Sequence, residues 1–155
     1  MTARRIGIAL LAAIAAMMML TQFFRPAIDN PPAGGALDAP PEIAALLRGS
    51  CYDCHSNETH WPFYARVAPL SWLVVHDVNR GRQELNFSEW NTYFPQTRHR
   101  KLQWIERSLT QEHMPPRIYT LMHPGSRLSA ADRTTINNWI ETQLAEPGAP
   151  STSTH

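Results

Sequence analysis

The feature that most constrains this chain is a pentad at residues 51–55, which reads CYDCH and holds the only two cysteines of the sequence. If the pentad forms one turn of helix, Cys51, Cys54 and His55 are related by three and four positions and share one face. Two thiols and one imidazole then point in the same direction. The surrounding fold must leave that face open to whatever these three groups bind.

A Cys-x-x-Cys-His run of this kind is typical of covalent haem attachment. Each thiol can add across a vinyl group of the porphyrin to form a thioether, and the imidazole can ligate the iron. We therefore predict one covalently bound haem c, attached through Cys51 and Cys54, with His55 as the proximal iron ligand. A disulfide would close a very short loop and stabilise little, a redox dithiol pair would need a βαβ context, and zinc would need further ligands.

The second axial ligand is predicted to be Met114. The two prolines that follow it keep the chain extended, so its thioether would sit on a stiff loop and could be aimed at the iron. The alternatives are that Met114 only fills a gap in the core, that Met122 is the ligand, or that the position is open. His113, next to Met114, and His76, within an apolar stretch, are the histidine alternatives.

The chain begins with two arginines, Arg4 and Arg5, and an uncharged run over residues 6–24 that ends at Arg25. A helix of this length spans about 28 Å, close to the thickness of a bilayer core. Positive residues before the run keep that end in the cytoplasm, which puts the rest in the periplasm. We expect residues 1–25 to be an inner-membrane anchor. A cleaved signal, leaving a soluble periplasmic protein, is the alternative.

The remainder of the chain has the composition of one small domain. Residues 26–37 are rich in Pro and Gly and predict a flexible linker, residues 38–144 the domain, and residues 145–155 a disordered tail. After residue 25 the chain has 11 basic and 13 acidic residues (14 − 3 and 13 − 0), hence a charge of −2. Because a nucleic-acid binder usually carries clustered positive charge, we exclude nucleic acid as a partner.

An all-α domain is predicted from four segments. Pro40 and Pro41 open a helix that leads into the pentad, and a second apolar stretch runs from Pro69 to near Gly81, where β-branched residues leave a strand as the alternative. Apolar stripes predict a third helix, capped by Thr97 and ending near 112, and a fourth that follows Ser129. The charged run 98–101 is interpreted as a solvated helix start, with haem propionates or an acidic partner as the other possibility.

The run SCYDCHSNETHWPFYARVAPLSWLVVHDVNRGRQELNFSEW at 50–90 resembles the bacterial haem-binding domain family of small c-type cytochromes. Residues 22–32, the MPP at 114–116, Tyr119 and the RLS at 127–129 agree with it. The resemblance covers about residues 22–142. It implies a monohaem, mainly helical, cytochrome c-like domain with Cys51, Cys54 and His55 on the haem and Met114 as distal ligand.

Two protein ligands would leave no open position on the iron, so we expect single-electron transfer on the extracytoplasmic side of the membrane. No Ser-His-Asp order or phosphate loop is recognisable, which favours an electron carrier over an enzyme. The alternatives are a haem-based sensor with a displaceable distal ligand and a peroxidase-like enzyme. The expected partners are redox proteins of unknown identity, the cytochrome c maturation machinery and the inner membrane.

Overall fold

The computed structural model describes residues 2–145, and every regular element among them is a helix. The prediction of an all-α chain is therefore confirmed, and the apolar stretch after Pro69 is a helix rather than a strand. The longer helices are α1 (Thr2–Thr21), α2 (Pro41–Ser50), α4 (Leu70–Glu84), α5 (Pro95–Thr110) and α7 (Ala130–Ala145). The short ones are α3 (Tyr52–His55), α6 (Arg117–Met122) and the 3-10 turns η1 (Gln22–Phe24), η2 (Phe63–Arg66), η3 (Phe87–Thr92) and η4 (Pro124–Ser126).

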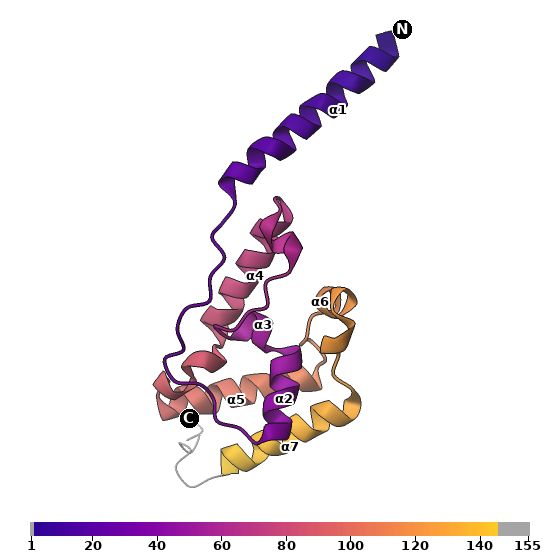
Figure 1. The fold of residues 1–155 in the computed structure, drawn as a ribbon. Helices are drawn as coiled ribbons and strands as arrows, with labels where there is room; N and C mark the ends of the chain where they lie inside the picture. Colours follow the sequence, from indigo (N-terminus) through magenta and orange to yellow (C-terminus); the bar gives the residue numbers. More distant parts are fainter. Residues whose placement is uncertain (1, 146–155) are drawn as a thin grey trace, which may run out of the picture.

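Helix α1 stands apart from the rest of the chain and projects away from it (Figure 1). Residues 3–24 are long and apolar enough to cross a membrane, and none of that stretch is buried against the domain. Length and composition of this kind suit either a membrane anchor or a signal sequence. The predicted apolar N-terminal helix is therefore present.

The segment between α1 and α2 lies along the domain instead of hanging free (Figure 1). The backbone N–H groups of Gly35 and Leu37 donate to Ser88 O and Phe87 O at 3.1 and 2.9 Å, and Asn30 Nδ2 donates to Thr59 O at 3.0 Å. These contacts differ from the expectation of a flexible linker over 26–37. The backbone N–H and C=O groups of this segment form hydrogen bonds with η3. In a free linker the same groups would be hydrogen-bonded to water.

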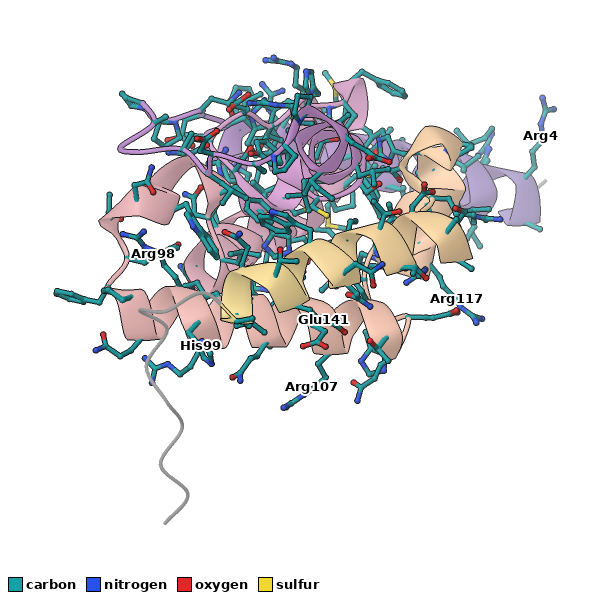
Figure 2. All side chains as sticks on the ribbon, turned by 90° about the horizontal axis from the view of Figure 1, so that it is seen from below. Arg4, Arg98, His99, Arg107, Arg117 and Glu141 are labelled. Atoms are coloured by element: carbon teal, nitrogen blue, oxygen red, sulfur yellow. The ribbon has the colours of Figure 1, made fainter. Side chains whose placement is uncertain are left out.

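The core is formed mainly by α2, α5 and α7 together with η3. Helices α5 and α7 pack side by side, and the predicted α5 stripe, Leu102, Ile105 and Leu109, is buried. Of the predicted α7 stripe, Ile136 and Ile140 are buried, while Trp139 and Leu144 are half-buried against the same core. Figure 2 shows this pair, with Arg107 pointing away from the domain. The aromatic rings of Tyr52 and Phe87 stack at 5.2 Å and extend the core to the pentad.

Two predicted helix boundaries need correction. Helix α5 begins at Pro95 instead of being capped by Thr97, because a proline suits the first helical position. Helix α4 continues past Gly81 to Glu84. The predicted capping signal of α7 is confirmed, since Ser129 N donates to Asp132 Oδ2 at 2.8 Å and Asp132 N to Ser129 Oγ at 3.1 Å. The predicted disordered tail falls, apart from Ala145, outside the described residues.

Candidate functional site

The pentad forms a single tight turn at the junction of α2 and α3. Cys51 is the residue between the two helices, and its carbonyl oxygen accepts hydrogen bonds from the N–H groups of Cys54 at 3.2 Å and His55 at 2.9 Å. This geometry brings the two cysteines and the histidine together as the spacing predicted. Both thiols are free, so the alternative of a Cys51–Cys54 disulfide is not formed.

The two thiols lie in surroundings that keep them protonated. Burial raises the pKa of Cys51 to about 12, and burial together with the nearby Asp53 carboxylate raises the pKa of Cys54 to about 11. Redox-active dithiols usually have a lowered thiol pKa, because the thiolate is the nucleophile. The environment of this pair therefore differs from that of a thioredoxin-like site.

The imidazole of His55 is buried and oriented by two backbone carbonyls. Its Nδ1 lies 2.9 Å from Gly81 O and 3.1 Å from Leu85 O, both at the C-terminal end of α4. Burial lowers the pKa of His55, so the ring is held neutral and has one N–H. Because both partners of Nδ1 are acceptors, the proton must be on Nδ1, and Nε2 keeps its lone pair.

This orientation depends on a very close approach between α3 and α4. A Cβ added at Gly81 would lie 2.4 Å from Cys54 O and 3.0 Å from Cys54 C. Only a residue without a side chain lets the two backbones come this near. Gly81 therefore sets the position of α4 relative to the pentad.

Asp53, in the middle of the pentad, joins it to α6. Its Oδ2 accepts a hydrogen bond from Tyr119 Oη at 2.7 Å, and its Oδ1 accepts one from His60 N at 2.9 Å. The Tyr119 ring stacks on His123 with centroids 4.5 Å apart, and His123 Nε2 lies 3.3 Å from Tyr64 Oη. Burial and the Asp53 carboxylate raise the pKa of Tyr119, so this phenol stays protonated and donates.

Met114 lies on the loop between α5 and α6 and is half-buried. Its carbonyl accepts a hydrogen bond from Arg133 Nη1 at 3.2 Å, which ties the loop to α7. The helices on either side of the loop both reach the pentad: Trp104 of α5 meets the His55 ring with centroids 6.1 Å apart, and Tyr119 of α6 binds Asp53. The Met114 loop thus joins two helices that each contact the pentad.

The alternative ligands occupy more open positions. Met122 ends α6 and is 57% exposed, and His113 is exposed next to Met114. His76 is exposed on α4, so it is not the core histidine that a lone His in an apolar stretch suggests. In the charged run 98–101, Arg98 donates to Tyr93 O at 2.9 Å and the Lys101 ammonium lies 4.6 Å from the Tyr93 ring centroid. These two side chains are bound to neighbouring parts of the domain.

A polar network behind the pentad escaped the sequence analysis. Asn57 N donates to Ser88 Oγ at 2.9 Å, and Asn86 Nδ2 donates to Asn57 Oδ1 at 2.8 Å. Arg82 Nε donates to Ser56 O at 2.8 Å, directly after the pentad. The only local signal of this network was the number of asparagine and serine residues that follow the pentad and α4. It did not indicate which of these residues form hydrogen bonds with one another.

These residues fit a haem attached through the pentad. The fit rests on His55, a neutral imidazole whose Nε2 carries a lone pair and has no hydrogen-bond partner among the described residues. Cys51 and Cys54 flank it on the same turn with free thiols. No group of three or more His, Cys, Asp or Glu side chains within residues 2–145 is arranged to hold a metal ion by itself.

Comparison with known proteins is consistent with this site. A family model described as a haem-binding domain matches residues 16–142. The cytochrome c peroxidase Ccp of Escherichia coli (strain K12) is 26% identical over 110 residues, which are 67% of this chain and 23% of that protein. The chain thus spans less than a quarter of that relative. The comparison with solved structures gave no match.

Proposed function

The chain belongs to the haem-binding domain family, and we propose that it is a membrane-anchored c-type cytochrome that transfers single electrons on the extracytoplasmic side of the membrane. In this proposal Cys51 and Cys54 would hold one haem through thioethers, and His55 and Met114 would ligate its iron. The observation that carries it is the fixed tautomer of His55, because a ligand histidine needs its second nitrogen held by an acceptor.

Each residue has a separate task in this proposal. When bound, the haem supplies an iron that cycles between its ferric and ferrous states. Cys51 and Cys54 keep the group attached, and the Gly81 and Leu85 carbonyls fix the ring plane of His55 and increase its basicity. A Met114 thioether favours the ferrous state more than a second imidazole would, which suits an electron carrier.

The contacts that follow α1 support an anchor over a cleaved signal. The Gln22 side chain exchanges two hydrogen bonds with Ala68, since its Nε2 donates to Ala68 O and its Oε1 accepts from Ala68 N, both at 3.1 Å. Phe24 O accepts from Trp72 Nε1 at 2.9 Å. Cleavage near Pro26 would remove both partners from the mature domain. Specific contacts to the domain are expected of a segment that stays attached.

Covalent attachment is tested on denaturing gels stained for haem-dependent peroxidase activity. Wild-type protein should keep the stain after unfolding, because thioethers survive denaturation. The double variant Cys51→Ser/Cys54→Ser should lose it. A stain that persists in the double variant would show that the haem is not held by these cysteines.

The distal ligand is tested by matched methionine variants. The oxidised wild type should be low-spin and show the weak far-red band of sulfur-to-iron charge transfer. Met114→Ala should lose that band and bind carbon monoxide when reduced, while the covalent haem stays, and Met122→Ala should change neither. The opposite result in the two variants would make Met122 the ligand, and a bis-histidine wild-type spectrum would make His113 the first candidate.

A peroxidase-like function is the second candidate, favoured by the similarity to the Escherichia coli cytochrome c peroxidase. It requires an open or readily displaced distal position, as does a haem-based sensor. Rapid and complete carbon monoxide binding to the reduced wild type would favour this class. Turnover of hydrogen peroxide with a reduced cytochrome as electron donor would then distinguish the enzyme from the sensor.

A further inference from the structure

The junction between α1 and the haem-binding domain is bound tightly to the domain. The reciprocal Gln22–Ala68 pair and the Trp72–Phe24 hydrogen bond lie within the first few residues after α1. The Arg25 side chain adds a hydrogen bond from Nη1 to Arg66 O and another from Nε to Gln22 O at 2.9 Å. Residues 22–25, which join α1 to the domain, therefore form a held turn, that is, a turn fixed by hydrogen bonds to the domain. As a result, α1 and the domain have one preferred relative orientation.

The part of the domain beside the end of α1 carries exposed apolar side chains. Phe63 of η2 is 81% exposed, and Leu70 and Leu73 of α4 are 50% and 58% exposed. Phe23 and Phe24 of η1 are also exposed on the other side of the junction. Large apolar groups gathered in one place usually mark a surface that is covered by a partner or by lipid.

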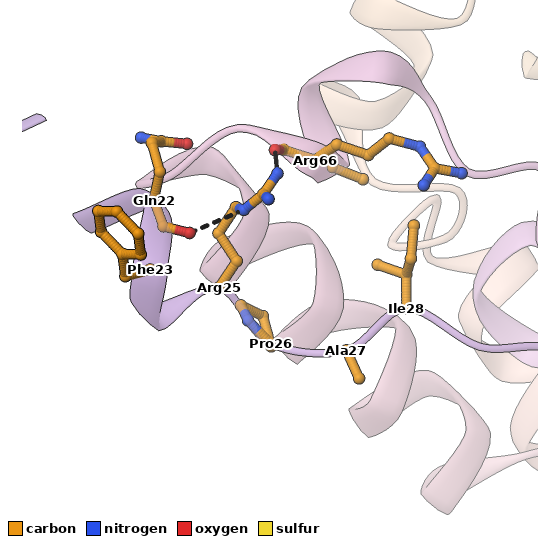
Figure 3. A pocket seen from close by; sticks show the side chains of 8 residues that line it. Gln22, Phe23, Arg25, Pro26, Ala27, Ile28 and Arg66 are labelled. Carbon is orange, nitrogen blue, oxygen red and sulfur yellow. Dashed lines mark hydrogen bonds between the residues drawn. The ribbon is translucent and has the colours of Figure 1, made fainter. Parts of the chain in front are cut away.

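A pocket at the same junction adds positive charge (Figure 3). It has a volume of about 330 Å³ and is lined by residues of 22–28 together with Ala65 and Arg66. Within residues 2–145 the guanidinium of Arg66 makes no hydrogen bond or ion pair, and in Figure 3 it extends away from Arg25. The guanidinium of an arginine at a membrane surface is attracted to the phosphate groups of the lipids.

We propose that these residues form a membrane-proximal surface, which lies in the headgroup region of a phospholipid bilayer. The surface consists of Phe23, Phe24, Phe63, Leu70 and Leu73 together with Arg25 and Arg66. The inference rests on the proposed function in one respect, that α1 is a retained anchor. The occupant is argued from continuity: α1 would leave the bilayer at Thr21, and the held turn puts η2 and the start of α4 directly beside that exit (Figure 1). Apolar side chains flanked by arginine are the composition of an interfacial contact.

As a consequence, the domain would keep a fixed distance from the bilayer and a fixed orientation, whereas a domain on a flexible linker would change both. Leu70, in the surface, and Gly81, behind His55, are 11 residues apart on α4, since 81 − 70 = 11. At 1.5 Å per residue, the pentad is at most about 17 Å further from the bilayer along α4.

Photo-crosslinking to lipid tests the surface in the full-length haem-loaded protein. The photoreactive residue p-benzoyl-phenylalanine replaces Phe63 in one variant and Phe94 in a matched control. Both phenylalanines are exposed, at 81% and 78%, but Phe94 lies at the start of α5, away from the junction. A third variant carries the same residue in place of Leu11, within the apolar run of α1. Each is reconstituted into vesicles of phosphatidylethanolamine and phosphatidylglycerol and illuminated.

We expect the Phe63 and Leu11 variants to gain the mass of one phospholipid and the Phe94 variant to remain unmodified. Lipid adducts at Leu11 but not at Phe63 would overturn the inference and leave the anchor intact. Equal adducts at Phe63 and Phe94 would also overturn it, because the domain would then meet the membrane without a preferred face. Absence of adducts at Leu11 would refute the anchor and the inference with it.

Discussion

Replacing Gly81 by alanine tests the contact that positions His55. In the native structure the new Cβ would lie 2.4 Å from Cys54 O, whereas ordinary contacts are 3.4–4 Å. The two helices must therefore separate by about 1.0 Å (3.4 − 2.4), and the neighbour is backbone, which cannot rotate aside. The hydrogen bond from His55 Nδ1 to Gly81 O, now 2.9 Å, is part of the same contact and should lengthen.

The expected loss of stability combines three effects. Overpacking costs about 1–3 kcal/mol, weakening of the hydrogen bond from His55 Nδ1 to Gly81 O costs up to about 1 kcal/mol, and alanine in a helix gains about 1 kcal/mol over glycine. The net loss is about 1–3 kcal/mol, a large share of the roughly 5–15 kcal/mol that stabilise a typical domain. We therefore expect a clear shift of the unfolding midpoint to lower denaturant.

Gly49→Ala is the matched control. Gly49 is exposed on α2, and a Cβ added there would meet nothing within 4 Å. Only the helix propensity changes, so Gly49→Ala should stabilise the protein by up to about 1 kcal/mol. The two variants make the same chemical change and are predicted to move stability in opposite directions.

Urea unfolding followed by circular dichroism measures both variants, with equal denaturant slopes as the check that the two-state analysis holds. In the haem-loaded protein, Gly81→Ala should also shift the reduction potential or the Soret maximum, because the carbonyl that orients His55 has moved. A Gly81→Ala protein as stable as the wild type would refute the close α3–α4 contact and the account of the His55 orientation.

Further predictions concern the contacts of α6 and α7 and the stability of the folded protein at alkaline pH. Tyr119→Phe should destabilise by about 1–2 kcal/mol in urea unfolding, since it removes a 2.7 Å hydrogen bond to the Asp53 carboxylate but keeps the ring. Ser129→Ala should cost about 1 kcal/mol in the same assay through loss of the α7 cap, with Thr134→Ala as the control inside the helix. Ile136→Ala, at a fully buried position, should cost about 2–5 kcal/mol and lower the thermal midpoint accordingly. Because the pKa of Tyr119 is raised in the folded state, the unfolded chain releases this proton first as pH rises above about 10, so stability should fall there, and less steeply in Tyr119→Phe.

The parts of the fold that were predictable from sequence depend on short-range rules. The apolar run over 6–24 makes a helix because its length and composition permit little else, and the stripes at 102–109 and 136–140 face the core because their spacing puts them on one side of a helix. Ser129 and Asp132 satisfy each other's backbone N–H groups within one turn. The pentad was recognisable for the same reason, since its three groups lie within five residues.

The short elements were missed because they are stabilised by partners distant in sequence. Helix α6 has only six residues, and its place is set by the Tyr119–Asp53 hydrogen bond across 66 positions. The segment over 26–37 looked like a linker because Pro and Gly are common in linkers, yet its backbone pairs with η3 fifty or more positions later. The composition of a segment indicates which conformations the segment can adopt. It does not indicate which part of the domain the segment packs against.

The sequence by itself determined the chemistry of the site: two thiols and an imidazole on one turn, a methionine before two prolines, and an apolar helix near the start of the chain. The tertiary structure decided how that chemistry is oriented. His55 carries its proton on Nδ1 only because α4 brings the Gly81 and Leu85 carbonyls to it, and α4 comes that near only because residue 81 has no side chain. A tautomer is set by the groups that surround the ring, and these come from 26 and 30 residues further along the chain, beyond the reach of any local pattern.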